Sequence, residues 1–341
     1  MRRVLFTALA VLLSHPSLDA QLSYSRGQNV SPGYEGWEEN EDGSFSFLFG
    51  YMNRNWLEEI DVPVGPDNMI SPGPADQGQP THFLPRRNRF IFKARVPSDF
   101  GDQEMVWTLT TQGVTEYAYA SLRTDYKVDP MVIASETGAL GAGTSSPETR
   151  SNRAPAVRII GDRELTARVG QPLTLVAEVT DDGLPRRRRD RSAAAAAPAA
   201  ADSAAAGDSP VSDDAAAPSD EADKGPRLSA RALRPPSRVT VGKIVGLHLS
   251  WFVYRGPEFV HPGPESVVFD PIQVKVWEDT RAAANSPWGP LWVPPELPED
   301  GRWEVQVTFD EPGTYVLRAR ADDGAAYTDE DVTVNVTTLL P

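Results

Sequence analysis

The stretch from Phe309 to Gly324 reads FDEPGTYVLRARADDG and predicts a strand between two turns. Tyr315, Leu317, Ala319 and Ala321 alternate with other residues at a period of two, which is typical of a strand with one buried face. A Pro-Gly pair precedes this strand and an Asp-Asp-Gly turn follows it, and both are turn signals. Further alternating runs are expected to form strands at 157–160, 173–179, 247–253, 272–276, 303–309 and 332–336. Seven or so short strands of this kind predict a β-sandwich of two sheets.

This part of the chain resembles the PKD and cadherin-like immunoglobulin-fold modules of secreted bacterial proteins. The Pro-Gly-Thr-Tyr run looks like their penultimate strand, Leu173 to Gly183 looks like their second strand and its turn, and Asn152 to Pro155 looks like their entry. The resemblance covers 155–338 and implies an immunoglobulin-like sandwich. In such a sandwich Tyr315 would form a tyrosine corner and Trp251 would fill the core between the sheets.

An insertion at 186–237 interrupts this second domain between its second and third predicted strands. Arginines at 186–189 and 191 lead into a tract rich in alanine, serine, aspartate and proline with almost no larger aliphatic residue. Such a tract buries too little apolar area to offset about 1–2 kcal/mol of backbone entropy per residue. The sequence therefore predicts a disordered segment.

The preceding segment, 21–137, reads as a separate aromatic-rich β domain. Phe45, Phe47, Phe49 and Tyr51 alternate with smaller residues, and comparable runs occur at 90–96 and 107–110. Stretches at 34–37, 49–56 and 78–85 resemble uncharacterised exported bacterial β-domain proteins, a resemblance that carries no known chemistry. A stretch rich in Gly, Ser, Thr and Pro at 138–154 predicts a flexible linker. The fold class is therefore all-β, with two sandwich-like domains.

Residues 1–20 have the pattern of a secretory signal peptide. Arg2 and Arg3 precede an apolar run from Val4 to Leu13, and a small residue, Ala20, ends the segment. No later stretch approaches the length of a transmembrane helix. We expect an exported protein, periplasmic or extracellular, without a transmembrane segment.

Composition excludes several classes of function. The 341 residues carry 33 basic and 48 acidic side chains, a net charge of −15, which disfavours binding to nucleic acid. The chain has no cysteine, so thiol enzymes, zinc fingers, iron–sulfur proteins and disulfide scaffolds are excluded. It contains neither a nucleophile elbow nor a zinc-protease or phosphate-loop motif.

The doubled Asp-Asp-Gly turn is the strongest candidate for a site. Asp181 and Asp182 follow the second predicted strand, and Asp322 and Asp323 follow the sixth. In an immunoglobulin topology these two loops emerge at the same end, where four carboxylates would suit Ca²⁺. The alternative is that both pairs only form turns. Apart from this calcium hypothesis, no cofactor is expected.

Two further groups of side chains suggest binding. Phe252 and Tyr254 face away from Trp251 on their strand, and Trp288 and Trp292 lie in a proline-rich loop, so we expect exposed rings that stack on a glycan or anchor a protein. His82, Arg86 and Arg87 are a candidate anion cradle, the alternative being local packing.

These observations predict a non-enzymatic binding or structural module at the cell surface or in the periplasm, whose partner is a glycan or a protein. The alternative is a secreted hydrolase with a catalytic N-terminal domain and an accessory immunoglobulin-like domain. Convergence of His82, Arg86, Arg87 and nearby carboxylates in a pocket would favour the hydrolase. The sequence does not indicate an oligomeric state.

Overall fold

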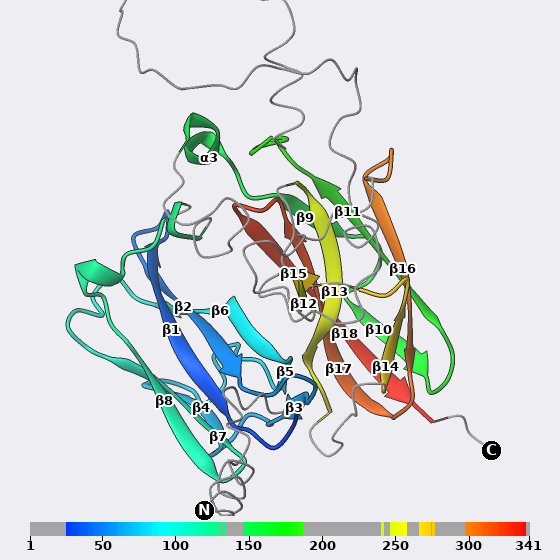
Figure 1. Cartoon of the computed structure of the whole chain (residues 1–341), viewed down its shortest axis with the longest axis horizontal. Helices are drawn as coiled ribbons and strands as arrows, with labels where there is room; N and C mark the ends of the chain where they lie inside the picture. Colours follow the sequence, from blue (N-terminus) through cyan, green and yellow to red (C-terminus); the bar gives the residue numbers. More distant parts are fainter. Residues whose placement is uncertain are drawn as a thin grey trace, which may run out of the picture.

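The structure is a computed structural model of the chain (Figure 1). It describes residues 25–129, 131–133, 146–186, 240–241, 246–257, 266–273, 275–276 and 297–338. The predicted signal peptide, Trp288, Trp292 and all but the first residue of the predicted insertion lie outside the described residues.

The N-terminal domain is a sandwich of two antiparallel three-stranded sheets. One sheet has the order β1-β2-β6 and the other the order β4-β7-β8, and a two-stranded ladder joins β3 to β5. The strands are β1 (Val30–Glu39), β2 (Phe45–Asn53), β3 (Ile60–Asp61), β4 (Asn68–Ser71), β5 (His82–Phe83), β6 (Arg86–Val96), β7 (Met105–Thr111) and β8 (Val114–Ala120). A short 3₁₀ helix, η1 (Thr124–Tyr126), follows β8.

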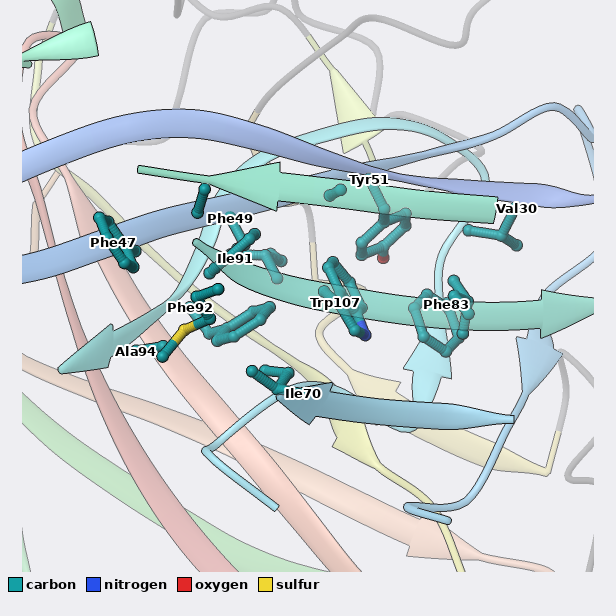
Figure 2. Close-up of a cluster of buried hydrophobic side chains, with 14 of the residues drawn as sticks. Val30, Phe47, Phe49, Tyr51, Ile70, Phe83, Ile91, Phe92, Ala94 and Trp107 are labelled. Atoms are coloured by element: carbon teal, nitrogen blue, oxygen red, sulfur yellow. The ribbon is translucent and has the colours of Figure 1, made fainter. Parts of the chain in front are cut away.

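Aromatic rings fill the space between these two sheets (Figure 2). Phe49 stacks on Phe92 at 5.1 Å between ring centroids, and Trp107 meets Phe92 edge to face at 5.0 Å. The indole N–H of Trp107 donates to Asn68 Oδ1 at 2.9 Å, which satisfies its only polar atom. The aromatic alternation that marks β2 in the sequence thus supplies one wall of the core.

The C-terminal domain is a second sandwich, with sheets β10-β18-β17-β13 and β14-β16-β11-β9. Its strands are β9 (Ala156–Ile159), β10 (Glu164–Arg168), β11 (Leu173–Thr180), β13 (His248–Arg255), β14 (Val267–Asp270), β16 (Arg302–Phe309), β17 (Gly313–Asp322) and β18 (Tyr327–Thr337). Two short strands, β12 (Thr240–Val241) and β15 (Lys275–Val276), pair in parallel beside it.

This strand order is that of an immunoglobulin-like sandwich. Strands β9, β11, β16 and β14 occupy the places of A, B, E and D, while β13, β17 and β18 occupy those of C, F and G. The chain switches sheets between β9 and β10, and β10 then runs parallel to β18. The all-β, two-sandwich prediction is confirmed.

Two predicted core residues have the expected roles. Tyr315 is fully buried, and its hydroxyl donates to the carbonyl of Glu311 at 3.1 Å, which is the hydrogen bond of a tyrosine corner. Trp251 is buried in the core of the second sandwich.

Other elements differ from the sequence prediction. Strands β10 and β14 were not predicted, and within the described residues of the strand expected at 272–276, Lys275–Val276 is a strand and 272–273 are not. Within the predicted linker, Pro147–Ser151 forms a short helix, α3. Ser146 Oγ accepts from the Thr149 N–H, and the Thr149 hydroxyl oxygen accepts from the Ser146 N–H, so a capping box starts the helix.

The second sandwich packs against the side of the N-terminal sandwich at which β6 is the edge strand (Figure 1). Residues of β13 are buried on both faces of the strand: Trp251 and Val253 in the second core, and Phe252 and Tyr254 in the same cluster as Phe92 and Trp107. The sheet that contains β13 and β17 therefore covers the β6 edge of the N-terminal sandwich.

Candidate functional site

Two arginines of β17 cross from the second sandwich into the first. Arg318 and Arg320 lie on the face of β17 opposite to Leu317 and Ala319, and both are buried. Each lies directly across the hairpin from an aspartate of β18, with Arg318 opposite Asp331 and Arg320 opposite Asp329. The register of one hairpin therefore pairs both arginines before the other domain is reached.

Arg318 binds three groups at once. Its Nε and Nη2 donate to the two carboxylate oxygens of Asp331 at 2.7 and 2.8 Å, a bidentate pair. Its Nη1 donates to the backbone carbonyl of Ile91 in the N-terminal domain at 2.5 Å. The guanidinium also lies 3.4 Å from the ring centroid of Tyr254. Burial disfavours the charge, but Tyr254 and the two aspartates outweigh it and raise the pKa of Arg318.

Arg320, two residues farther along β17, makes a similar set of contacts. Its Nε and Nη2 donate to Asp329 at 2.6 and 2.5 Å, and Nη2 also donates to the carbonyl of Phe90 at 2.9 Å. The ring of Tyr327 lies 4.2 Å from its guanidinium. With 1% of its surface exposed, Arg320 is among the most buried large side chains of the described residues.

A bulge in β6 presents the carbonyls that these arginines bind. Phe49 pairs with Phe92 and Tyr51 with Asn88, so three residues of β6 face the single Gly50 of β2, and Phe90 adopts a φ of 50°. A side chain at position 50 would lie 2.5 Å from the Asn88 carbonyl oxygen, so the irregularity requires glycine. The bulge leaves the Phe90 and Ile91 carbonyls to accept from Arg320 and Arg318.

A third arginine clamps the other end of the interface. Arg255 donates to both oxygens of Asp76 at 2.9 and 2.7 Å and to the Gln79 carbonyl at 3.0 Å. Backbone groups also form hydrogen bonds between the two domains here: the Thr81 N–H donates to the Tyr254 carbonyl, and the Gly256 N–H donates to the Thr81 hydroxyl. The loop before β5 is thus attached to the end of β13.

The expectation that Phe252 and Tyr254 are exposed rings is wrong. Both side chains are buried in the interface between the sandwiches, and the Tyr254 hydroxyl donates to the carbonyl of Gly78. The alternation correctly placed them opposite to Trp251. It did not show that the N-terminal domain covers that face.

The predicted anion cradle is also wrong. His82 is 4% exposed, and both of its ring nitrogens are within hydrogen-bond distance of carboxylates: Nδ1 is 2.8 Å from Asp61 Oδ1 and Nε2 is 3.0 Å from Glu59 Oε2. Burial by itself would lower the pKa of His82, but Asp61 and Glu59 outweigh it and raise the pKa to about 10. His82 is therefore a buried imidazolium between two anions.

Arg86 and Arg87 point to other partners. The guanidinium of Arg87 pairs with Glu35 at 2.5 Å, while Arg86 lies over the ring of Trp56 at 4.3 Å. The three residues of the predicted cradle do not converge on one site.

The two Asp-Asp-Gly turns lie at the same end of the second sandwich, bridged by the entry segment. Asn152 Nδ2 donates to Asp323 Oδ2 at 2.9 Å, and the Arg153 N–H donates to Asp182 Oδ2 at 3.1 Å. Asp181 and Asp182 also accept from the backbone of their own loop, and so do Asp322 and Asp323. Within the described residues, no group of three or more His, Cys, Asp or Glu side chains is arranged to hold a metal ion. Calcium binding there stays a prediction.

Asp323 makes the stability of this end depend on pH. Burial and the neighbouring Asp322 raise the pKa of Asp323 to about 7. Because protonation is easier in the folded chain, its contribution to stability is complete below about pH 4 and is lost as the pH rises through 7. The slope reaches about 1.4 kcal/mol per pH unit.

Comparing urea unfolding of the wild type and Asp323→Asn from pH 4 to 8 isolates this slope. We expect the free energy of unfolding of the wild type to fall relative to that of the variant as the pH rises. A constant difference between the two proteins would contradict the assignment.

The outer face of the N-terminal sandwich presents a surface that the sequence analysis missed. Side chains of β8 alternate, so that Ala118 and Ala120 enter the core while Tyr117 and Tyr119 point outward, 53% and 57% exposed. Each tyrosine ends a row of outward side chains that crosses β4, β7 and β8. One row is Met69, Thr108 and Tyr117, and the other is Ser71, Val106 and Tyr119. Thr110 and Thr115 complete what we call the tyrosine face, the outward residues Met69, Ser71, Val106, Thr108, Thr110, Thr115, Tyr117 and Tyr119. The alternation at 114–120 was the available signal.

Neither protein-family models nor curated proteins match the chain. Among solved structures it is similar to the N-terminal eight Ig domains of Down syndrome cell adhesion molecule (TM-score 0.22, 8% identity, covering 91% of this chain and 27% of that one). It is also similar to titin domains Z1Z2 in complex with telethonin (0.21, 8%, 91% and 98%) and to surface layer protein SbsC domains 1–6 (0.21, 7%, 92% and 28%). At these TM-scores the likeness says nothing about function, and the immunoglobulin-like fold follows from the strand order.

Proposed function

We propose that the chain is a non-catalytic binding or structural module that works outside the cytoplasm as one rigid body. The observation that carries this proposal is the interface in which Arg318 and Arg320 bind carbonyls of the other sandwich while paired to Asp331 and Asp329. If the two sandwiches separated, these arginines would lose their carbonyl partners on β6. Buried charges that lose partners are costly, so the interface holds the two sandwiches together.

Two features support the location and the class of protein. The pattern of residues 1–20 is that of a signal peptide, and the second sandwich has the immunoglobulin-like strand order expected from its resemblance to PKD and cadherin-like modules. In the described part of the chain, no helix is both long and apolar enough to cross a membrane. We infer a surface or periplasmic module whose partner is a glycan or a protein.

The hydrolase alternative has less support. It requires an accessible acid–base pair in the N-terminal domain, and the histidine that it would use, His82, is enclosed between Glu59 and Asp61. A positive charge fixed between two anions stabilises the fold instead of shuttling protons.

The rigid-body proposal predicts how the chain unfolds. We expect calorimetry of the full chain to give one cooperative transition, with equal calorimetric and van't Hoff enthalpies, because the sandwiches share buried charges. Fluorescence of the buried tryptophans, Trp107 in one core and Trp251 in the other, should report the same midpoint as circular dichroism. Two separate transitions would show that the sandwiches behave as independent domains.

A further inference from the structure

The tyrosine face lies on the sheet β4-β7-β8, and β8, which carries both tyrosines, is the strand of this sheet that lies farthest from the second sandwich (Figure 1). Its two tyrosine rings lie 6.1 Å apart between centroids and at 33° to each other, on one strand and two residues apart. Both are more than half exposed, whereas rings such as Phe49, Phe92 and Trp107 of this domain are packed between the sheets. An apolar strip with hydroxyl groups along it is thus turned to solvent.

The tyrosine face differs from the rest of the molecule in having no charged side chain among its eight residues. Charged side chains make up 24% of the chain, and the net charge is −15, yet none of the eight outward residues of the tyrosine face is charged. A polyanion would find no cation to pair with there and would meet a protein of its own sign. The face therefore suits an uncharged ligand.

The size of the face argues against a stable protein partner. Strands β7 and β8 have seven residues each, and three strands lie side by side, so the strip is about 24 Å long and about 10 Å between its outer strand axes. That area of about 240 Å² is well below the roughly 800 Å² per partner that stable protein interfaces bury. A long, narrow strip matches an extended chain better than a globular surface.

We propose that the tyrosine face binds a neutral polysaccharide, with successive sugar rings stacked on Tyr117 and Tyr119. The C–H groups on the face of a pyranose ring pack on the π-face of tyrosine, and its hydroxyls hydrogen-bond with the neighbouring threonines and serine. This inference deepens the proposed function, because it rests on a non-catalytic module and names the class of its partner.

Affinity electrophoresis of the full-length chain tests the proposal. Native gels would contain one of four soluble neutral polysaccharides (mixed-linkage β-glucan, glucomannan, xylan or dextran) or the polyanion alginate. The variant Tyr117→Thr/Tyr119→Thr removes both rings but keeps a hydroxyl and a residue that favours strands. The variant Tyr117→Phe/Tyr119→Phe keeps both rings. Tyr126→Ala removes an exposed tyrosine that lies outside the face.

We expect at least one neutral polysaccharide to retard the wild type, the phenylalanine variant and Tyr126→Ala, and we expect the threonine variant to bind at least tenfold more weakly. No retardation in any neutral gel, retardation by alginate alone, or equal retardation of the threonine variant would overturn the proposal. The proposal would also be overturned if sedimentation velocity showed a dimer of the wild type and a monomer of the threonine variant, because a second copy of the chain would then occupy the face.

The outcomes separate this inference from the rigid-body proposal. A single unfolding transition without retardation would refute only this inference. Two transitions with ring-dependent retardation would refute only the rigid-body proposal.

Discussion

Replacing Arg320 with methionine is expected to lower the free energy of unfolding by about 3 kcal/mol, at the lower end of the cost of breaking a buried ion pair. The change removes the bidentate pair with Asp329 and the hydrogen bond to the Phe90 carbonyl, so a carboxylate and a carbonyl in the interface lose their donor. Methionine keeps much of the side-chain volume of arginine. The loss in free energy of unfolding therefore measures the missing charge and hydrogen bonds more than a change in packing. Urea unfolding followed by tryptophan fluorescence measures it.

The same sheet offers a matched control. Arg163, beside the edge strand β10, pairs with Glu330 of β18, the residue next to Asp329, but more than half of the Arg163 side chain is exposed. Arg163→Met should cost no more than about 1 kcal/mol, as exposed pairs do. The double variant Arg320→Met/Asp329→Leu should recover much of the loss, because no buried charge is left unpaired. Equal losses for Arg320→Met and Arg163→Met would show that the interface does not depend on this pair.

Alternation along a strand predicts which residues share a face but does not show what covers that face. For β17 it correctly assigned Tyr315, Leu317 and Ala319 to the core, because apolar residues at a period of two have one physical explanation. It gave no reason to bury Arg318 and Arg320, because arginines on the second face of a strand ordinarily face solvent. Only the position of the N-terminal sheet explains their burial.

The same limit explains the error at Phe252 and Tyr254. Their aromatic character suggested binding, and they do bind, but within the chain and to the other sandwich. Better signals existed at two points. The aspartates at 329 and 331 mirror the arginines across a predicted turn, and the alternation at 114–120 puts Tyr117 and Tyr119 on the face opposite to Ala118 and Ala120.

The carboxylates that meet at His82 show the same limit. Neighbours on a strand face opposite ways, so adjacent glutamates such as Glu58 and Glu59 do not point at one partner. The residues that meet at His82 are Glu59 and Asp61, which are two apart and therefore share a side. Their partner lies some twenty residues away on β5, which pairs with β3. Such a triad depends on which strands pair, and one sequence does not give that.

His82 should make the fold sensitive to alkaline pH well below the range in which lysines titrate. Its pKa is about 10 in the folded chain and near 6.5 when the chain is unfolded, because Asp61 and Glu59 hold the proton. The stabilisation is therefore complete below about pH 6.5 and is lost as the pH rises through 10. Between pH 7 and 9.5 we expect the free energy of unfolding to fall by about 2–3 kcal/mol.

The control variant His82→Gln cannot change its charge in this range. It should be less stable than the wild type at pH 7, because two largely buried carboxylates lose their cation, and the difference should shrink steadily toward pH 9.5. Limiting the range to pH 9.5 keeps the tyrosines of the unfolded chain, which titrate near 10, out of the comparison. Urea unfolding of both proteins at four pH values measures the difference, and groups that titrate equally in both, such as Asp323, cancel. A difference that stays constant from pH 7 to 9.5 would mean that His82 is neutral in the fold, and its two hydrogen bonds would then need a proton on a carboxylate instead.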